Sequence, residues 1–271
     1  MRPDASWSLQ PGVLCAVAVL AGAYVMGWRR ARARAGGRGA DALRLTAGLG
    51  GLVAVLVALI SPLDRLSDQM LSMHMLQHLL LLDVAPVLVL LGLTKVLLRP
   101  IARQLLRIER GAGALAHPAL AVALYVAGTW AWHVPALYDA AVRHPLVHVT
   151  EHLTFLAVGG LYWWHLLSPV RARAGLSGMG PAVYMASTKV LVGLLGVMLA
   201  FAPGTLYPHY AHQPRYWGLS AHDDQAVAGL LMALEQSLLM GIALAVLFFR
   251  ALTESERREQ RAERLLEADG A

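Results

Sequence analysis

Long apolar stretches recur along the chain, and short polar or charged segments separate them. About twenty apolar residues in a helix cross the hydrocarbon core of a bilayer, so each stretch predicts a transmembrane helix. Stretches of that length lie at about residues 9–28, 43–63, 69–92, 115–137, 145–167, 181–203 and 224–249. The expected fold class is therefore all-α, an integral membrane bundle of seven transmembrane helices.

The overall composition supports this interpretation. Of the 271 residues, 57% are hydrophobic and 15% are charged, a balance too apolar for a soluble domain of this size. We expect one domain in the lipid bilayer at residues 1–250, followed by a charged cytoplasmic tail at residues 251–271. Acidic residues and arginines alternate along that tail, which is typical of a short solvated helix.

Positive charge is distributed unevenly between the two sets of loops. One set carries most of the Lys and Arg residues, at 29–44, 95–110, 171–173 and from 250 onward, whereas the other holds Arg2, Arg65, Arg143 and Arg215. Positive loops remain in the cytoplasm, so we expect the N-terminus outside and the C-terminus in the cytoplasm. Topology accounts for the basic character without a nucleic acid partner. Binding of RNA or lipid headgroups by residues 29–38 is a less favoured alternative.

Histidines gather at one depth of the predicted bundle. His74 and His78 lie about 6 and 12 Å below the outer end of their helix, and His148 and His152 lie about 5 and 10 Å down theirs. Each pair is four residues apart and projects from one helix face. His133 is placed near the outer end of a third helix. A lone histidine at such a place is usually an interfacial or packing residue, but five in one layer predict a metal site.

The neighbours of these histidines favour copper as the metal. Gln77 and Glu151 are predicted to support the imidazoles from a second shell. Met70, Met73 and Met75 add thioethers, and soft ligands together with imidazole favour copper, although methionine is more often an apolar filler. Two alternatives stay open. The layer can bind zinc for intramembrane hydrolysis with Glu151 as the base, or it can ligate a haem through two histidines.

Asp83, Lys189 and Glu235 are charged residues that fall deep inside the predicted spans. Asp83 and Lys189 each lie about 12 Å from the cytoplasmic ends of their helices, and Glu235 is near the middle of the last helix. An isolated charge is expensive there, so we expect one cluster that faces the bundle interior. We predict that Asp83 and Lys189 approach each other closely. A structural ion pair is the favoured role, and a proton or ion path is the alternative.

The predicted outer loop before the last helix is also rich in histidine. It carries aromatic residues together with His209, His212, His222 and Asp223. Such a loop can capture a cation or dock a partner. A solvated loop with aromatic interface anchors is an equally good interpretation.

Several motifs together resemble those of the CtaG family of cytochrome oxidase assembly factors, described for caa-type oxidases. The resemblance covers about residues 45–250 and rests on 74–81 (HMLQHLLL), Ala85-Pro86, Gly92, 132–139 (WHVPALYD), 144–155 (HPLVHVTEHLTF), 162–164 (YWW) and 224–232 (DQAVAGLLM). The matched positions include His74, His78, His133, His148, Glu151, His152, Asp224 and Met232. Asp83, Lys189 and the Ala233 to Glu235 segment depart from the family pattern.

The resemblance implies a function. A member of this family is a multi-pass protein of the bacterial cytoplasmic (inner) membrane that is needed to make an active copper-containing terminal oxidase. It implies binding of copper at the outer histidines, delivery to a cytochrome c oxidase subunit and a copper donor protein as a further partner. A metallochaperone of this kind is not an enzyme.

Overall fold

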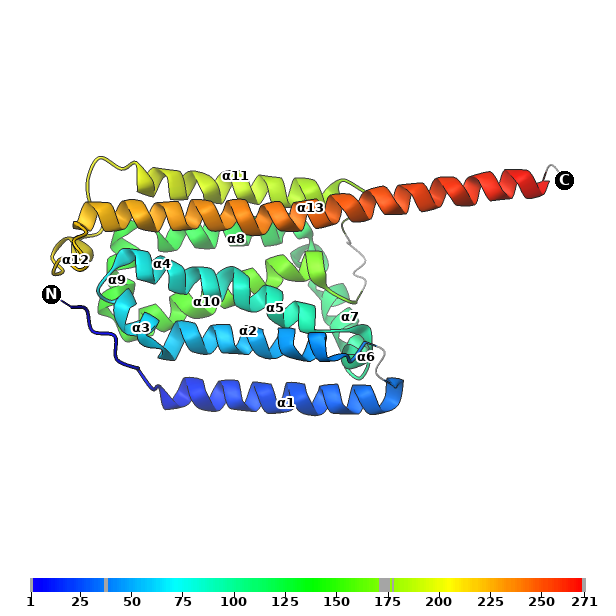
Figure 1. Cartoon of the computed structure of the whole chain (residues 1–271), viewed down its shortest axis with the longest axis horizontal. Coiled ribbons are helices and arrows are strands. Elements are labelled where there is room, and N and C mark those ends of the chain that lie inside the picture. The colour runs from blue at the N-terminus through cyan, green and yellow to red at the C-terminus, as the bar shows by residue number, and fades with distance from the viewer. Residues whose placement is uncertain (1, 37–38, 171–175, 177, 270–271) are drawn as a thin grey trace.

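The chain folds into a bundle of helices (Figure 1). The computed structural model describes residues 2–36, 39–170, 176 and 178–269, and no strand is present among them. The predicted all-α class is confirmed. Three arginines that contribute to the predicted charge asymmetry, Arg38, Arg171 and Arg173, lie outside the described residues.

Long helices run roughly along one axis, and short helices close the two ends of the bundle (Figure 1). The long elements are α1 (Pro11–Ala35), α2 (Ala42–Ile60), α8 (Pro118–Trp132), α10 (Pro145–Leu167), α11 (Gly180–Ala200) and α13 (Ala221–Asp269). One end carries α3 (Pro62–Ser67), α9 (Pro135–Arg143) and α12 (Pro208–Ala211). The other end carries α6 (Lys95–Leu98), α7 (Ala102–Ala112) and η2 (Gly113–Ala116).

Helices long and apolar enough to cross a membrane are present, which supports a membrane protein. Four such helices occur among the described residues, Pro11–Ala35, Ala42–Ile60, Leu71–Gly92 and Gly180–Ala200, and the bent pair α8 and α9 makes up to five. Seven spans are therefore not clearly present. α10 has the predicted bounds, but His148, Glu151 and His152 lower its apolar character. The fourth predicted segment bends by 74° near His133.

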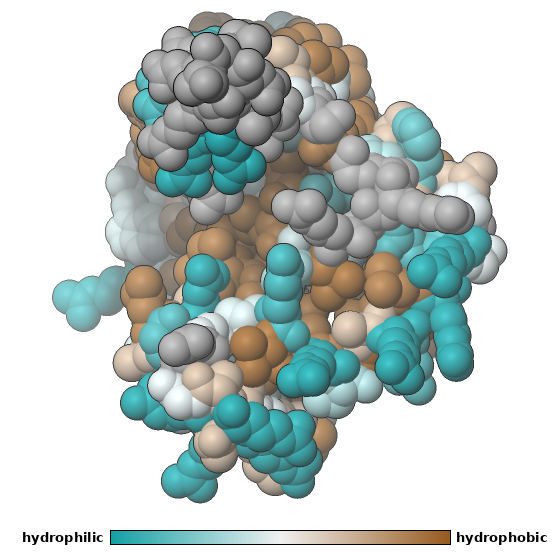
Figure 2. All heavy atoms as spheres, turned by 90° about the vertical axis from the view of Figure 1, so that its right-hand side faces the viewer, coloured by the Kyte–Doolittle hydropathy of each residue, from teal (hydrophilic) through white to brown (hydrophobic). Residues whose placement is uncertain are grey.

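The last helix is longer than predicted. α13 continues through the predicted span and the charged tail to Asp269, so the tail is helical but is not a separate element. Its far part projects beyond the bundle (Figure 1). Hydrophilic side chains gather at this end of the molecule (Figure 2), where Arg99, Arg103, Arg107 and Arg110 are exposed. The prediction that this end faces the cytoplasm fits that charge.

The span Leu71–Gly92 lies at the centre of the bundle. Its apolar window is 61% buried, compared with 6% for α1 at the edge. It consists of α4 (Leu71–Leu79), the π-helical turn η1 (Leu80–Val84) and α5 (Ala85–Gly92). In this turn the N–H of Ala85 donates to the carbonyl of Leu80, five residues earlier. A π-helical turn inserts one extra residue and changes which side chains share a face.

Gly159 lets α10 approach this turn. A Cβ atom at position 159 would lie 2.0 Å from the carbonyl oxygen of Leu82. That oxygen belongs to the backbone and cannot rotate away. A side chain at this position therefore has no space unless the helices separate.

Replacing Gly159 with alanine is expected to destabilise the bundle. Overpacking of a core costs about 1–3 kcal/mol, and the rigid backbone neighbour favours the upper end of that range. The measurement is the thermal unfolding midpoint in detergent. Gly160→Ala is the matched control, because no atom lies within 4 Å of a Cβ atom there. Equal midpoints for the two variants would show that η1 and α10 do not pack as described.

Candidate metal centre

Asp224 of α13 fixes the start of the helix that carries His74 and His78. Its carboxylate accepts hydrogen bonds from the N–H of Leu71 at 2.6 Å, the N–H of Ser72 at 3.3 Å and the hydroxyl of Ser72. The first N–H groups of a helix lack partners within the helix, so a carboxylate there satisfies them. A residue 153 positions away in sequence thus holds the first turn of α4 in place.

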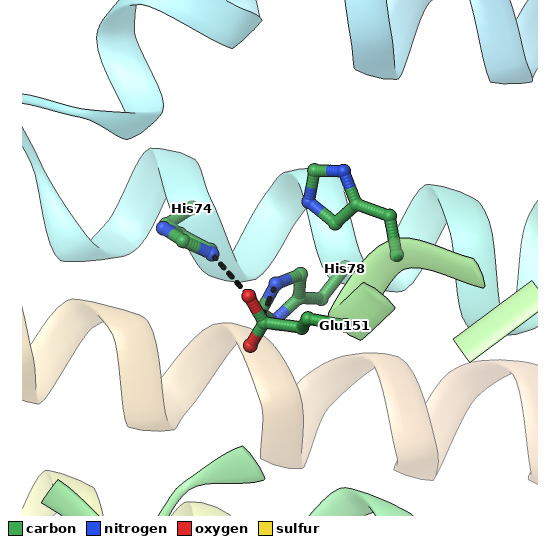
Figure 3. A group of neighbouring side chains, drawn as sticks. His74, His78 and Glu151 are labelled. Atoms are coloured by element: carbon green, nitrogen blue, oxygen red, sulfur yellow. Dashed lines mark ion pairs between the residues drawn. The ribbon is translucent and has the colours of Figure 1, made fainter. Parts of the chain in front are cut away.

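Two helices bring a buried group of potential ligands together. His74 and His78 project from α4 toward Glu151 and His152 of α10, and one ligand atom from each lies within 4.8 Å of all the others. Glu151 Oε2 is 3.8 Å from His74 Nε2, and Glu151 Oε1 is 3.6 Å from His78 Nε2 (Figure 3). Three imidazoles and a carboxylate are a donor set that first-row transition metals accept.

Several buried atoms of this group have no hydrogen-bond partner within the described chain. They are His74 Nε2, both ring nitrogens of His78, His152 Nε2 and both carboxylate oxygens of Glu151. Each unsatisfied buried polar group costs about 1–3 kcal/mol. A metal ion at the centre would satisfy several of these atoms at once, so the residues present fit a metal ion.

His148 completes the pair on α10 and lies at the edge of the group. Its ring centroid is 4.2 Å from that of His152 and 5.3 Å from that of His74. It is partly exposed, whereas His74, His78 and His152 are buried. His148 therefore lies between the buried candidate ligands and the surface.

The network around Tyr210 sets the tautomer of His74. The hydroxyl of Tyr210 donates to the carbonyl of Ser67 at 2.6 Å, and its oxygen lies 2.8 Å from His74 Nδ1. His74 must then donate through Nδ1, which leaves the lone pair of Nε2 directed at the ligand group. The sequence motifs did not single out Tyr210; the only signal was its place in the aromatic outer loop.

His133 is held beside a methionine. It donates through Nδ1 to the carbonyl of Thr129 at 2.7 Å, and its Nε2 lies 3.2 Å from the sulfur of Met75. A neutral imidazole oriented in this way has no proton on Nε2, and a thioether has none to donate. Two electron-pair donors therefore face each other, and the His133 ring centroid is 6.3 Å from that of His78.

The structure changes the roles predicted for Gln77 and Glu151. Gln77 donates to the carbonyl of Ala58 at 2.8 Å and to Asp64 Oδ1 at 3.1 Å, so it supports the α2–α3 connection and not an imidazole. Gln77 is one residue before His78 and points to another face of α4. Glu151, predicted to hydrogen-bond an imidazole from behind the metal ligands, lies among the potential ligands themselves.

The predicted ion pair between Asp83 and Lys189 is not formed in the described part of the chain. Asp83 instead accepts hydrogen bonds from Tyr125 and Trp163. Thr188 takes the fully buried position on α11, and Lys189 is partly exposed. Equal depth along two helices did not fix which face each residue occupies. Glu235 does lie beside Asp83, as predicted.

The histidines of the outer loop bind backbone carbonyls. His209 pairs with Asp68 at 2.9 Å, His212 with Pro208 at 2.6 Å and His222 with Ala202 at 2.9 Å. Asp223 accepts from Ser220 at the start of α13. These contacts hold the loop in its conformation above the histidine layer. They favour a structural role for the loop and not the capture of a cation.

Because Asp83 and Lys189 do not interact, their substitutions should act independently. Asp83→Asn is expected to cost about 1–3 kcal/mol through its weakened hydrogen bonds, and Lys189→Met much less. The double variant should match the sum within about 0.3–0.5 kcal/mol. Thermal unfolding of the three variants in detergent measures this. If the double variant were more stable than Asp83→Asn alone by several kcal/mol, the result would show that Asp83 and Lys189 do form an ion pair.

Comparison with known protein families identifies the family of this chain. The model of the family described as cytochrome c oxidase caa3 assembly factor (Caa3_CtaG) matches residues 22–254. This range includes α4, α8 and α10 with all five histidines of the layer. No curated protein and no solved structure matches the chain.

Proposed function

The chain belongs to the cytochrome c oxidase caa3 assembly factor family, and we propose that it binds copper at its histidine layer and supports delivery of the ion to the oxidase. Membership implies association with a cytochrome c oxidase and suggests a role other than catalysis. The observation that carries the copper proposal is the convergence of unpartnered buried nitrogen and oxygen atoms from His74, His78, Glu151 and His152.

The pair of His133 and Met75 favours copper over zinc. A set of three imidazoles and a carboxylate suits zinc and copper alike. The thioether of Met75, 3.2 Å from the free nitrogen of His133, is a soft donor that cuprous ions accept and that is not among the usual ligands of zinc. His133 then serves as an additional ligand, or it binds the ion transiently beside the main group during transfer.

Neither alternative reading fits the layer as well. Hydrolysis on zinc requires Glu151 as a base, but Glu151 lies within the ligand group itself. A haem requires a flat cavity between two axial histidines, such as His74 and His152. The ring of His78 lies 4.3 Å from His74, and that of His148 lies 4.2 Å from His152, so both occupy the space beside that pair.

We further propose that the layer opens on the extracytoplasmic side of the bacterial cytoplasmic membrane. It lies toward the end of the bundle that carries α3, α9 and α12, opposite the arginine-rich α7 (Figure 1). The positive-inside rule places α7 in the cytoplasm. His148 at the rim would receive the ion from a copper donor protein, and the oxidase subunit would take it from the same face.

Substitution of a ligand should reduce bound copper without preventing membrane insertion. His78→Ala, His148→Ala and Glu151→Gln are each expected to lower copper retained after purification from copper-replete cells by at least about tenfold, since changes outside the ligand sphere already cost 10–100-fold. His165→Ala, at the opposite end of α10, is the matched control. Copper content that is equal in all four variants would remove these residues as ligands.

The hydroxyl of Tyr210 should matter for affinity, because it fixes the tautomer of His74. Tyr210→Phe is expected to weaken copper binding by about 10–100-fold while the protein stays folded. Tyr216→Phe in the same loop is the control, and competition with a copper chelator measures both. An unchanged affinity in Tyr210→Phe would mean that His74 is oriented by other contacts or is not a ligand.

A further inference from the structure

The π-helical turn brings Asp83 onto the side of the central helix that carries the histidines. In a regular α-helix the residue below His74 and His78 would be number 82, at the same four-residue spacing. The extra residue of η1 moves that position to 83, because hydrogen bonds in a π-turn join residues five apart. Asp83 is fully buried there.

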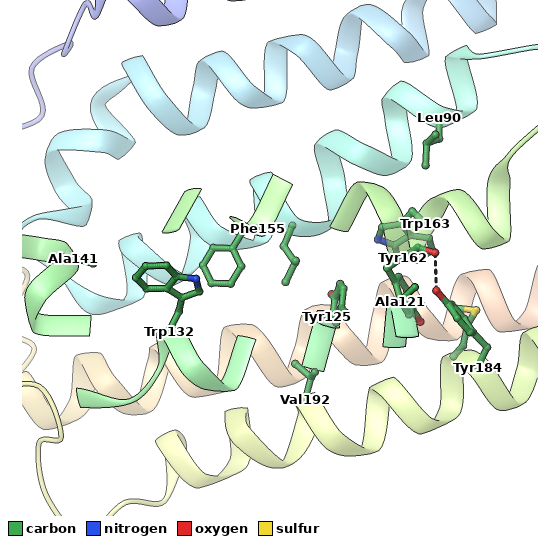
Figure 4. Close-up of a cluster of buried hydrophobic side chains, with 12 residues drawn as sticks. Leu90, Ala121, Tyr125, Trp132, Ala141, Phe155, Tyr162, Trp163, Tyr184 and Val192 are labelled. Carbon is green, nitrogen blue, oxygen red and sulfur yellow. Dashed lines mark hydrogen bonds between the residues drawn. The ribbon is translucent and has the colours of Figure 1, made fainter. Parts of the chain in front are cut away.

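The hydrogen bonds around Asp83 identify it as the ionised partner of a pair. The hydroxyl of Tyr125 donates to both carboxylate oxygens at 2.8 Å, and the indole N–H of Trp163 donates to Oδ1 at 2.7 Å. Tyr125 and Trp163 lie together in the aromatic cluster beside η1 (Figure 4). Two donors aimed at one carboxylate favour its charged form.

Glu235 of α13 has the opposite surroundings. It lies beside Asp83, and the side-chain amide of Gln236 is the donor placed against it, although neither Glu235 oxygen completes a hydrogen bond of normal geometry within the described chain. Gln236 is buried and also lies against Tyr125, and its Oε1 has no donor. The pocket therefore contains more acceptors than donors. Two adjacent carboxylates cannot both be charged there without a large energetic cost.

We infer that Asp83 and Glu235 form a proton-binding site that holds one proton between the two carboxyl groups. The proton resides on Glu235, whose O–H donates to Asp83, and the remaining negative charge is held by Tyr125 and Trp163. Release of the proton to water leaves two carboxylates and no other product. This site depends on neither the identity nor the presence of a metal at the histidines.

The groups that titrate or carry charge near this site are few. Along the central helix the nearest is His78, about one and a half turns away. α2 contributes only Arg44, which donates to the carbonyl of Leu91 at 2.6 Å. The others on the packed helices are Tyr125 of α8, Tyr162 and His165 of α10, Tyr184 and Lys189 of α11 and Glu235 of α13. Among them, no ion pair within the described chain neutralises Asp83 or Glu235.

Infrared spectroscopy of the purified full chain in detergent tests the site at pH 7, where an exposed glutamic acid is ionised. The wild-type spectrum minus that of Glu235→Gln should contain one carbonyl band of a protonated carboxylic acid, and this band should shift in heavy water. Glu256→Gln on the same helix is the control, because Glu256 is exposed. Its difference spectrum should show the loss of one ionised carboxylate.

A second variant, Asp83→Asn, tests the same proton by changing the group that accepts its hydrogen bond. In Asp83→Asn the acceptor is a weaker amide oxygen, so the acid band of Glu235 should persist and move to higher frequency. Glu235→Gln should also unfold within a few degrees of wild type, since a neutral amide replaces a neutral acid. Loss of a carboxylate band in Glu235→Gln, in place of an acid band, would overturn the proposal, as would an Asp83→Asn spectrum with an unshifted acid band.

Discussion

The need to satisfy polar groups in an apolar interior is the constraint on which this structure depends. In lipid or in a buried core, water is not available to bond an exposed N–H, imidazole or carboxylate. Buried polar groups of the described chain meet that need through the protein at several places: Asp224 bonds the first turn of α4, and Tyr210 bonds Ser67 and His74. Most of the buried polar atoms without a partner lie at two places, which are the sites proposed for copper and for a proton.

The central span joins these two places. α4 presents His74 and His78, and the π-helical turn then presents Asp83 on the same side, where Gly159 of α10 makes room for the backbone. α10 supplies His148, Glu151 and His152 near one end and Trp163 near the other. One pair of packed helices therefore positions most of the chemistry, while α1 lies at the edge and contributes none of it.

The sequence allowed prediction of the helical class and of the shared histidine layer, because the i and i+4 spacing fixes one helix face and the distance from a helix end fixes depth. It did not allow prediction of contacts that depend on rotation about the helix axis. Lys189 lies at the depth of Asp83 but on a partly exposed face of its helix. Gln77 lies on a face of α4 that does not carry the imidazoles. Tyr210 reaches His74 from 136 positions away, and apolar periodicity does not predict the π-turn that precedes Pro86. Among the described residues four or five helices qualify as spans, against the seven predicted, and the polar His148, Glu151 and His152 lower the apolar character of α10.

X-ray absorption at the copper edge, on the protein purified with copper, shows whether the histidine layer holds the ion. We predict stoichiometric copper whose scattering shows imidazole nitrogens as the main ligands, with this imidazole scattering reduced in His78→Ala and unchanged in His165→Ala. Copper bound without imidazole ligands, or a protein that retains zinc and no copper under the same conditions, would contradict it.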